Sequence, residues 1–441
     1  MAKDTPNTLN QSVIYEVYVR NHTEEGTFQS LVKDLDRIKG LGVDVIWLMP
    51  IHPIGQKGRK GSLGCPYAVQ DYGQVNPEYG TLEDFKILLE EIHDRGMACI
   101  IDVVYNHTAW DSKLLAEHPE YFYHENGAVA NRIEEWHDVV DLDYSHIALW
   151  DIQIGYLEYW VKLGVDGFRC DVASMVAVAF WKAARKRLKS LCPHIFLLAE
   201  SVEQDFITEL RQRGFYAASD GELYEAFDIL YDYDVFPDWK AYFKGLQDIK
   251  PYFDGIKRQT YLYPADSIKL RYLENHDNPR MRYWLKNPGA IWHWTLFTYL
   301  QKGTVLLYGG QETYDRTSPS LFEKDPVHWE LDEAYSLYLG RLNQWKKERL
   351  MAEGTYQIKT YEVSGAISLI YHSASEWLFS LFNFENKSGA VAVDLPDGDY
   401  INAYNGAQVR IDQGKMALSQ EPLVIWQDRL GVPKNVTVLA F

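Results

Sequence analysis

Four apolar stretches of this sequence each end in ionisable side chains. Asp102 and His107 lie at the end of the first stretch, and Asp171, Glu200 and Asp277 end the other three. A hydrophobic strand gains nothing from a terminal carboxylate unless the group is used there, because burying a charge is costly. Carboxyl groups gathered at one rim can act together as a nucleophile and a proton donor.

A recurring unit positions these side chains: an amphipathic helix, a glycine and a short apolar strand. One helical pattern runs over 31–38, and a second begins at Thr81, where Asp84 completes a capping-box pair. The tetrapeptide Leu-Gly-Val-Asp stands at 41–44 and again at 163–166. The predicted strands are 13–18, 45–50, 97–104, 167–171, 195–199, 227–231, 268–273 and 304–308.

Near-continuous apolar strands joined by helices predict a parallel sheet covered on both faces. An open doubly wound sheet would carry a glycine-rich phosphate loop after its first strand, and the sequence has none there. We therefore predict an α/β fold, a closed (β/α)₈ TIM barrel with its chemistry at the carboxyl ends of the strands. The barrel comprises 1–106 and 147–355, a small polar and aromatic insertion after strand three comprises 107–146, and alternating runs over 356–441 predict a C-terminal antiparallel β-sandwich.

The four strand-end segments, in this order and spacing, resemble the signatures of glycoside hydrolase family 13, the α-amylase superfamily. The segments are 102–107, 167–171, 198–200 and 274–277, and the stretch 138–143 is similar to a further motif in the family's insertion. The resemblance covers essentially the whole chain. It implies an α-glucan-active glycoside hydrolase of the intracellular α-amylase or maltodextrin-hydrolase type.

The resemblance implies that Asp171 is the nucleophile and Glu200 the acid/base of a retaining mechanism. Arg169 lies two residues before Asp171, so both side chains project to one side of a strand. We expect the guanidinium to keep Asp171 ionised. Glu200 follows an apolar run, and we expect burial to raise its pKa so that it holds a proton at working pH.

The resemblance also implies roles for further residues. Asp277 matches the third carboxylate, which grips sugar hydroxyls and favours the oxocarbenium-like state. His107 and His276 match histidines that hydrogen-bond the same sugar. Tyr67 matches an aromatic platform under the ring that is cleaved, and its alternative role is that of a packing ring.

Two positions support the site rather than touch substrate. Asp102 is expected to position Arg169. Asn106 matches a calcium-ligand position, and a plain hydrogen-bonding role is the alternative; no cofactor is obligatory. The stretch 172–176, Val-Ala-Ser-Met-Val, lacks the Lys-His pair common in secreted α-amylases, and this weakens the calcium expectation.

The composition disfavours some classes of binding partner. Lys and Arg total 44 and Asp and Glu total 62, so the net charge of −18 disfavours nucleic acid and anionic membranes. Aromatic residues make up 14% of the chain, which suits both a barrel core and a sugar ligand. The four cysteines have no metal spacing and are expected to be reduced thiols. The N-terminus has no apolar run, so we expect a cytoplasmic protein.

The predicted activity is hydrolysis of α-1,4-glucosidic bonds in malto-oligosaccharides or other α-glucans by double displacement. A transglycosylase, cyclomaltodextrinase, neopullulanase or α-glucosidase with the same catalytic residues is the alternative. A catalytically inactive binding subunit should have lost a carboxylate, and none is lost. An aldolase-like barrel needs a lysine at a strand end, whereas Lys269 begins a strand. Endo or exo action, preferred chain length and oligomeric state stay open.

Overall fold

The chain folds around a closed parallel barrel. We describe a computed structural model of residue 2 and residues 4–440, without the side chain of residue 288. In this part of the chain the barrel has eight strands in the order β1-β12-β11-β10-β9-β8-β3-β2, which confirms the predicted (β/α)₈ fold. The strands are β1 Val13–Val17, β2 Val45–Leu48, β3 Ala98–Val103, β8 Gly167–Cys170, β9 Phe196–Ala199, β10 Ile229–Tyr231, β11 Ile268–Arg271 and β12 Thr304–Tyr308.

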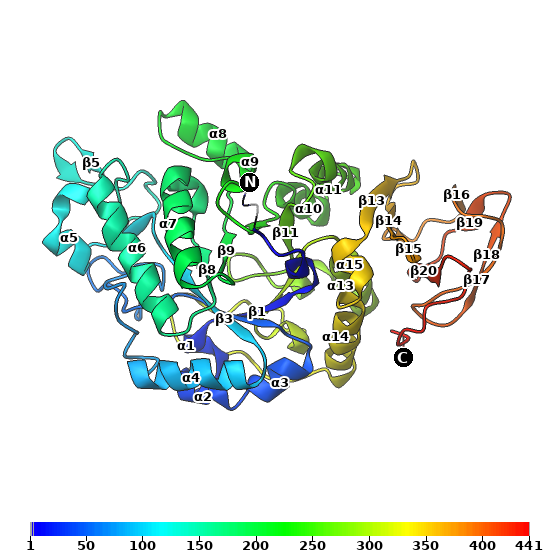
Figure 1. Cartoon of the computed structure of the whole chain (residues 1–441), viewed down its shortest axis with the longest axis horizontal. Helices are drawn as coiled ribbons and strands as arrows, with labels where there is room; N and C mark the ends of the chain where they lie inside the picture. The colour runs from blue at the N-terminus through cyan, green and yellow to red at the C-terminus, as the bar shows by residue number, and fades with distance from the viewer. Residues whose placement is uncertain (1, 3, 441) are drawn as a thin grey trace.

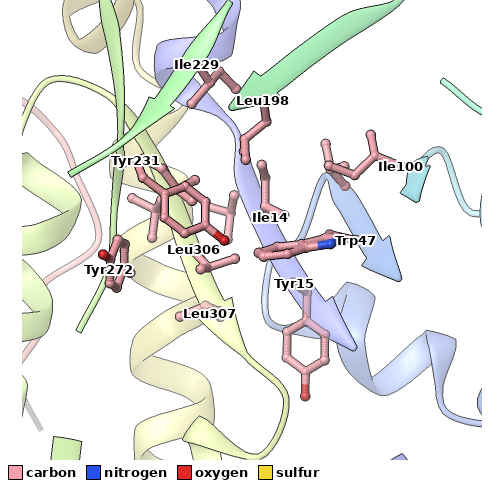
Figure 2. Packing of buried hydrophobic residues seen from close by; sticks show 14 of the residues in the cluster. Ile14, Tyr15, Trp47, Ile100, Leu198, Ile229, Tyr231, Tyr272, Leu306 and Leu307 are labelled. Carbon is pink, nitrogen blue, oxygen red and sulfur yellow. The ribbon is translucent and has the colours of Figure 1, made fainter. Parts of the chain in front are cut away.

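The barrel interior is a packed core. Figure 2 shows side chains from different strands gathered in its middle, and all of them are buried: Ile14, Trp47, Ile100, Leu198 and Leu306. Alternate residues of each strand project inward, so apolar residues at these positions fill the barrel rather than leave a channel. This core fixes the strand ends at which the polar groups lie.

Helices surround the barrel (Figure 1). The predicted capping box is present at α4, where the Thr81 amide donates to Asp84 Oδ2 over 2.8 Å. The helix predicted over 31–38 is instead two short helices, and the Asp34 side chain between them binds His22 and Arg37. The helices are α1 Val19–His22, α2 Phe28–Val32, α3 Leu35–Gly40, α4 Leu82–Asp94, α6 Ile147–Lys162, α7 Val178–Leu191, α8 Gln204–Gln212, α9 Asp220–Leu223, α10 Phe236–Phe243, α11 Lys250–Leu262, α12 Met281–Trp284, α13 Pro288–Leu300, α14 Glu333–Lys346 and α15 Arg349–Glu353, with short 3₁₀ turns at Asn7–Gln11, Pro119–Tyr121, Ala173–Met175 and Gln311–Thr313.

An irregular segment connects β3 to α6. It contains the antiparallel pair β4 (His107–Ala109) and β7 (Val139–Asp141), the helix α5 (Lys113–Glu117) and the small pair β5 (His124–Glu125) and β6 (Ala128–Val129). The pairing of β4 with β7 places His107 opposite Asp141. The segment therefore packs back onto the carboxyl end of β3, where the predicted site lies.

Two antiparallel sheets follow the barrel and confirm the predicted C-terminal sandwich. Figure 1 shows them at the end of the molecule opposite the β5 and α5 segment. Phe379 and Ile425 of one sheet pack with Val391, Ile411 and Met416 of the other. The strands, in order across each sheet, are β13 Thr355–Thr360, β14 Ala366–His372, β15 Glu376–Asn383 and β20 Leu423–Asp428, then β16 Ala390–Ala392, β19 Lys415–Ala417, β18 Gln408–Asp412 and β17 Gly398–Ile401.

The four cysteines carry free thiols. Among the residues described, no helix combines the length and the apolar character needed to span a membrane.

Candidate active site

One arginine joins the carboxylates at the strand ends. Arg169 on β8 donates from Nη1 to Asp102 Oδ1 over 3.0 Å and to Asp171 Oδ1 over 2.8 Å. Its Nη2 lies 2.9 Å from Oε2 of Glu200, which directly follows β9. All four side chains are buried. Three strands therefore bring these predicted residues together around one guanidinium.

Aromatic rings enclose the remaining faces of Arg169. Its guanidinium carbon lies 5.2 Å from the ring centroid of Trp47, 5.7 Å from that of Tyr67 and 5.3 Å from that of Tyr231. Burial opposes the positive charge, but the neighbouring carboxylates outweigh it and raise the pKa of Arg169 well above its usual value. The guanidinium is thus a fixed charge in a dry site, where electrostatic contacts are strong.

Three carboxylates share this single positive group, and protons must compensate part of their charge. Burial, followed by the charge of Glu200, raises the pKa of Asp171 well above its usual value, although Arg169 opposes the shift. Burial also raises the pKa of Asp102 to about 6. The expectation that Arg169 keeps Asp171 ionised left out burial, which is the largest cause of this raised pKa, and the second acid on the same guanidinium.

The turn after Asp171 holds Glu200 in place. The Val172 amide donates to Glu200 Oε2 over 2.8 Å, and the Ala173 amide donates to its backbone carbonyl over 3.0 Å. Val172 adopts φ 42° and ψ 43°, a left-handed conformation that costs a branched residue about 1–3 kcal/mol. Strain of this kind persists where the surroundings enforce it. Here it directs a backbone donor at the second carboxylate.

One oxygen of Asp171 has no hydrogen-bond partner. This oxygen, Oδ2, is buried and lies 3.9 Å from Nε2 of His107. The Asn106 amide donates to Nδ1 of His107 over 3.1 Å, so we assign the ring proton to Nε2. Burial lowers the pKa of His107 to about 4, and the ring is neutral. Asp171 therefore offers a free oxygen beside a neutral donor.

A second polar cluster surrounds His276. Its Nε2 donates to the Tyr67 hydroxyl over 2.7 Å and lies 3.3 Å from Asp277 Oδ2, and its Nδ1 binds Glu16. The Tyr67 hydroxyl donates onward to Asp102 Oδ2 over 3.0 Å. Burial opposes a charge on His276, but Asp277 and Glu16 outweigh it and raise its pKa to about 9. The ring is therefore an imidazolium that ties Asp277 to the Arg169 cluster.

Both clusters open into one pocket of about 470 Å³. Asp277 is the accessible acid, with 39% of its side chain exposed, whereas 7% of the Asp171 side chain is exposed. The pocket is lined by Lys60, Cys65, Tyr67, His107, Trp136, Asp138, Val139, Asp171, Val172, Glu200, Val202, Glu203, Phe206, Tyr233, Lys240, His276, Asp277, Asn278, Leu321 and Phe322. Aromatic and carboxylate groups thus face one cavity, an arrangement that suits a sugar.

Comparison with known proteins places the chain. The model of the α-amylase catalytic domain matches residues 10–137 and 133–334, and that of the bacterial α-amylase C-terminal domain matches 357–425. The chain belongs to the α-amylase family. It is 41% identical to an α-amylase from Lactobacillus plantarum whose crystal structure superimposes with a TM-score of 0.91, covering 96% of this chain and 100% of that one.

Two further relatives of this α-amylase-family chain share less of its sequence. The noncanonic maltogenic α-amylase AmyB from Thermotoga neapolitana is 31% identical, with a TM-score of 0.85 over 96% of this chain and 99% of that one. Alpha-amylase MalA of Haloarcula japonica is 26% identical over 91% of this chain. The chain spans 60% of the length of MalA.

Two residues of this active site, Glu16 and Tyr233, were not predicted from the sequence. Glu16 is fully buried within β1 and binds His276. Tyr233, just after β10, donates from its hydroxyl to Asp277 Oδ2 over 3.3 Å. A signal for Glu16 was available, because a carboxylate inside the apolar run 13–17 is costly to bury unless it has a charged partner. Tyr233 gave no such signal among 31 tyrosines.

Asn106 is the position suggested for calcium. Its side-chain amide nitrogen donates to Nδ1 of His107; in the adjacent strand Asp141 Oδ2 lies 3.1 Å from Nη1 of Arg132, and Asp141 Oδ1 is buried without a hydrogen-bond partner. Among the residues described, no group of three His, Cys, Asp or Glu side chains is placed to hold a metal.

Proposed function

We propose that this enzyme is a retaining glycoside hydrolase that cleaves α-1,4-glucosidic bonds in malto-oligosaccharides. The observation that carries this proposal is the shared guanidinium: Asp171 and Glu200 are held on two nitrogens of Arg169, and Asp171 keeps one unpartnered oxygen. Retaining hydrolysis needs two carboxyl groups about 5–5.5 Å apart across the scissile bond. A rigid fork that binds both groups supports such a spacing.

In the first step, Oδ2 of Asp171 attacks the anomeric carbon of the sugar. The bond from that carbon to the glycosidic oxygen breaks, and the proton shared by the acid pair passes through Glu200 to the departing oxygen. Arg169 stabilises the carboxylate that attacks. The products are a glycosyl ester on Asp171 and a free sugar with a new hydroxyl group.

In the second step, Glu200 is the base. It takes a proton from water, the water oxygen bonds to the anomeric carbon, and the ester bond to Asp171 breaks. The second inversion restores the α configuration. The acid pair again holds one proton, so the cycle is balanced.

The sugar that reacts is held by the second cluster. Asp277 accepts hydrogen bonds from sugar hydroxyls, while Nε2 of His107 donates to the same ring. The imidazolium of His276 and the hydroxyl of Tyr67 fix the position of this cluster. Interactions that strengthen as the ring flattens towards an oxocarbenium ion lower the barrier.

The test is the pair of variants Glu200→Gln and Asp171→Asn with maltotriose as substrate. Each should reduce kcat by at least about a thousandfold, while the circular dichroism spectrum stays native. Glu209→Gln, an exposed carboxylate on α8, is the control and should keep full activity. Proton NMR should show the α-anomer as the first product of the wild type. A β-anomer, or an active Glu200→Gln enzyme, would disprove the proposal.

Hydrolysis and transglycosylation differ in the molecule that accepts the glycosyl group, which is water in the first and a sugar in the second. The chain is 29% identical, over half of its length, to an α-1,4-glucan:maltose-1-phosphate maltosyltransferase of Picrophilus torridus. We propose water as the main acceptor here. Chromatography of the products from maltoheptaose, cyclodextrin and pullulan separates this activity from transglycosylase, cyclomaltodextrinase, neopullulanase and α-glucosidase activities.

We propose a cytoplasmic location for the enzyme. Four unpaired thiols, two of them fully buried at Cys99 and Cys170, support a reducing compartment. Fractionation of cells that express the natural gene, followed by immunoblotting, tests this location.

A further inference from the structure

An ion pair that the proposed mechanism does not use lines the active-site pocket. Nζ of Lys240, on α10, donates over 2.9 Å to Oε1 of Glu203, which directly precedes α8. Both residues line the pocket of about 470 Å³. Their side chains are 29% and 37% exposed, so an ammonium and a carboxylate keep free surface beside the cavity.

The chain between Glu200 and Glu203 limits how far this pair lies from the acid. Three residues of extended chain span at most about 11 Å, so the backbone of Glu203 lies within that distance of Glu200. The Ala173 amide donates to the Glu200 carbonyl over 3.0 Å. The Val202 amide donates to Ser174 Oγ over 3.2 Å. These bonds fix the turn, and with it the position of Glu203 close to the reacting groups.

Two aromatic rings lie between Glu203 and His107. The ring of Trp136 is 5.4 Å from that of His107 and 6.3 Å from that of Phe206, measured between centroids. Phe206 lies on α8, three residues after Glu203, and lines the same pocket. Glu203 therefore lies next to the wall that faces the reacting sugar, but beyond reach of the histidine that binds this sugar.

A second run of rings lies between Lys240 and Asp277. Tyr233 donates to Asp277 Oδ2 over 3.3 Å, and its ring centroid lies 5.9 Å from that of Phe236. Nζ of Lys240 lies 5.2 Å from the same Phe236 centroid. Asp277 and Lys240 are thus separated by two rings. The pair and the groups that hold the reacting sugar face one cavity at different places.

Another ion pair lines the pocket but is less available to a ligand. Nζ of Lys60 lies 2.8 Å from Oδ1 of Asp138 and also donates to the Glu135 carbonyl over 3.2 Å. The Asp138 side chain is only 4% exposed, so its carboxylate has little surface for a sugar. In the Lys240–Glu203 pair, by contrast, both charged groups are open to the solvent that a sugar would replace.

We propose that Lys240 and Glu203 form a second sugar-binding site, which holds the glucose unit next to the one that reacts. Each unit of an α-1,4-linked chain keeps free hydroxyl groups on two adjacent carbons, C2 and C3. One hydroxyl can donate to the carboxylate while the other accepts from the ammonium, which gives two charge-assisted hydrogen bonds. The inference rests on the proposed function and adds its substrate class: chains of glucose units rather than single glucosides.

The experiment compares maltotriose with α-glucosyl fluoride, which consists of the reacting sugar and a leaving group that is not a sugar. Lys240→Met and Glu203→Gln should each lower kcat/KM for maltotriose about 10- to 100-fold, because a charge-assisted hydrogen bond to the substrate is lost. The same variants should change kcat/KM for α-glucosyl fluoride less than about twofold. Lys244→Met, at an exposed lysine at the end of α10 that does not line the pocket, is the control and should change neither value.

The variants should fold, because a partly exposed ion pair contributes little to stability, and a native circular dichroism spectrum checks this. A third substrate, α-maltosyl fluoride, identifies the side on which the second sugar lies. Its added glucose is on the non-reducing side, so a loss as large as that with maltotriose supports a site on that side. A loss with maltotriose alone supports a site on the leaving-group side.

Three results would contradict the proposal, and they differ from its failure at the level of the enzyme. Equal losses with maltotriose and α-glucosyl fluoride would mean that the pair supports the reacting groups. Unchanged kinetics with maltotriose would mean that the pair binds no sugar. The same loss in the Lys244→Met control would mean that the effect is one of net charge. If the wild type hydrolyses neither substrate, the proposed function itself is overturned.

Discussion

The charge on His276 depends on Glu16, and this dependence gives a quantitative prediction. The pKa of His276 is about 9, whereas that of a free histidine is 6.5. This difference corresponds to about 3 kcal/mol, supplied by Asp277 and Glu16 against the cost of burial. Glu16→Gln keeps a hydrogen-bond acceptor for Nδ1 and removes the negative charge. A loss of about 1–2 units is expected for one adjacent charge.

Loss of the Glu16 charge should lower kcat/KM at high pH but not at low pH. If the pKa falls from about 9 to about 7.5, the protonated fraction at pH 8.5 falls from about 0.76 to about 0.09, an approximately eightfold change. At pH 6 the ring of His276 is protonated in both the wild type and the Glu16→Gln variant. The ratio of kcat/KM between wild type and Glu16→Gln should therefore be close to one at pH 6 and about eight at pH 8.5.

Two assays follow this change. NMR of the enzyme labelled with ¹⁵N-histidine reports the titration of His276 directly, and maltotriose kinetics report its effect on turnover. Glu312→Gln is the control for loss of a buried carboxylate, because Glu312 binds Tyr15 and Arg37 instead of His276. An unchanged titration of His276 in Glu16→Gln, or the same activity ratio at both pH values, would refute the reasoning.

The remaining predictions concern the support of the site and of the barrel. Tyr67→Phe keeps the ring but removes the hydroxyl that joins His276 to Asp102. The kcat/KM for maltotriose should therefore fall about 10- to 100-fold, while the circular dichroism spectrum stays native. An unaltered kcat/KM would argue against this link. Asp228→Asn removes one partner of a buried ion pair with Arg185, whose two contacts are 2.7 Å, and should lower the free energy of unfolding by about 3–5 kcal/mol in urea titrations. A loss below about 1 kcal/mol would mean that this pair is dispensable.

The barrel could be predicted because its strands carry a strong local signal. Each strand is a continuous apolar run, and the carboxyl ends of parallel strands meet at one rim, so positions 171, 200 and 277 had to be near each other. The helix over 31–38 was predicted as one element because its apolar spacing is regular. The structure interrupts it at Lys33 and Asp34, where the Asp34 side chain contacts His22 from outside that helix.

The pKa values of the site residues were harder to predict from the sequence than the identity of those residues. The raised pKa of Asp171 follows first from its burial and then from its closeness to Glu200 on another strand, and the sequence contains neither. The contacts of the loop over 57–64 are a similar case. They join residues 62 and 323, and 60 and 138, in irregular loops that have no periodicity. Such pairings are fixed by the folded barrel and cannot be deduced from composition.

The most direct test of the central claim is to trap the glycosyl ester. The Glu200→Gln variant can be incubated with 5-fluoro-α-glucosyl fluoride, whose good leaving group needs no acid and whose ring fluorine slows the second step. Mass spectrometry of a proteolytic digest should then show one fluoroglucosyl unit on Asp171. An adduct on any other carboxylate, or none during demonstrated release of fluoride, would contradict a nucleophile held on Arg169.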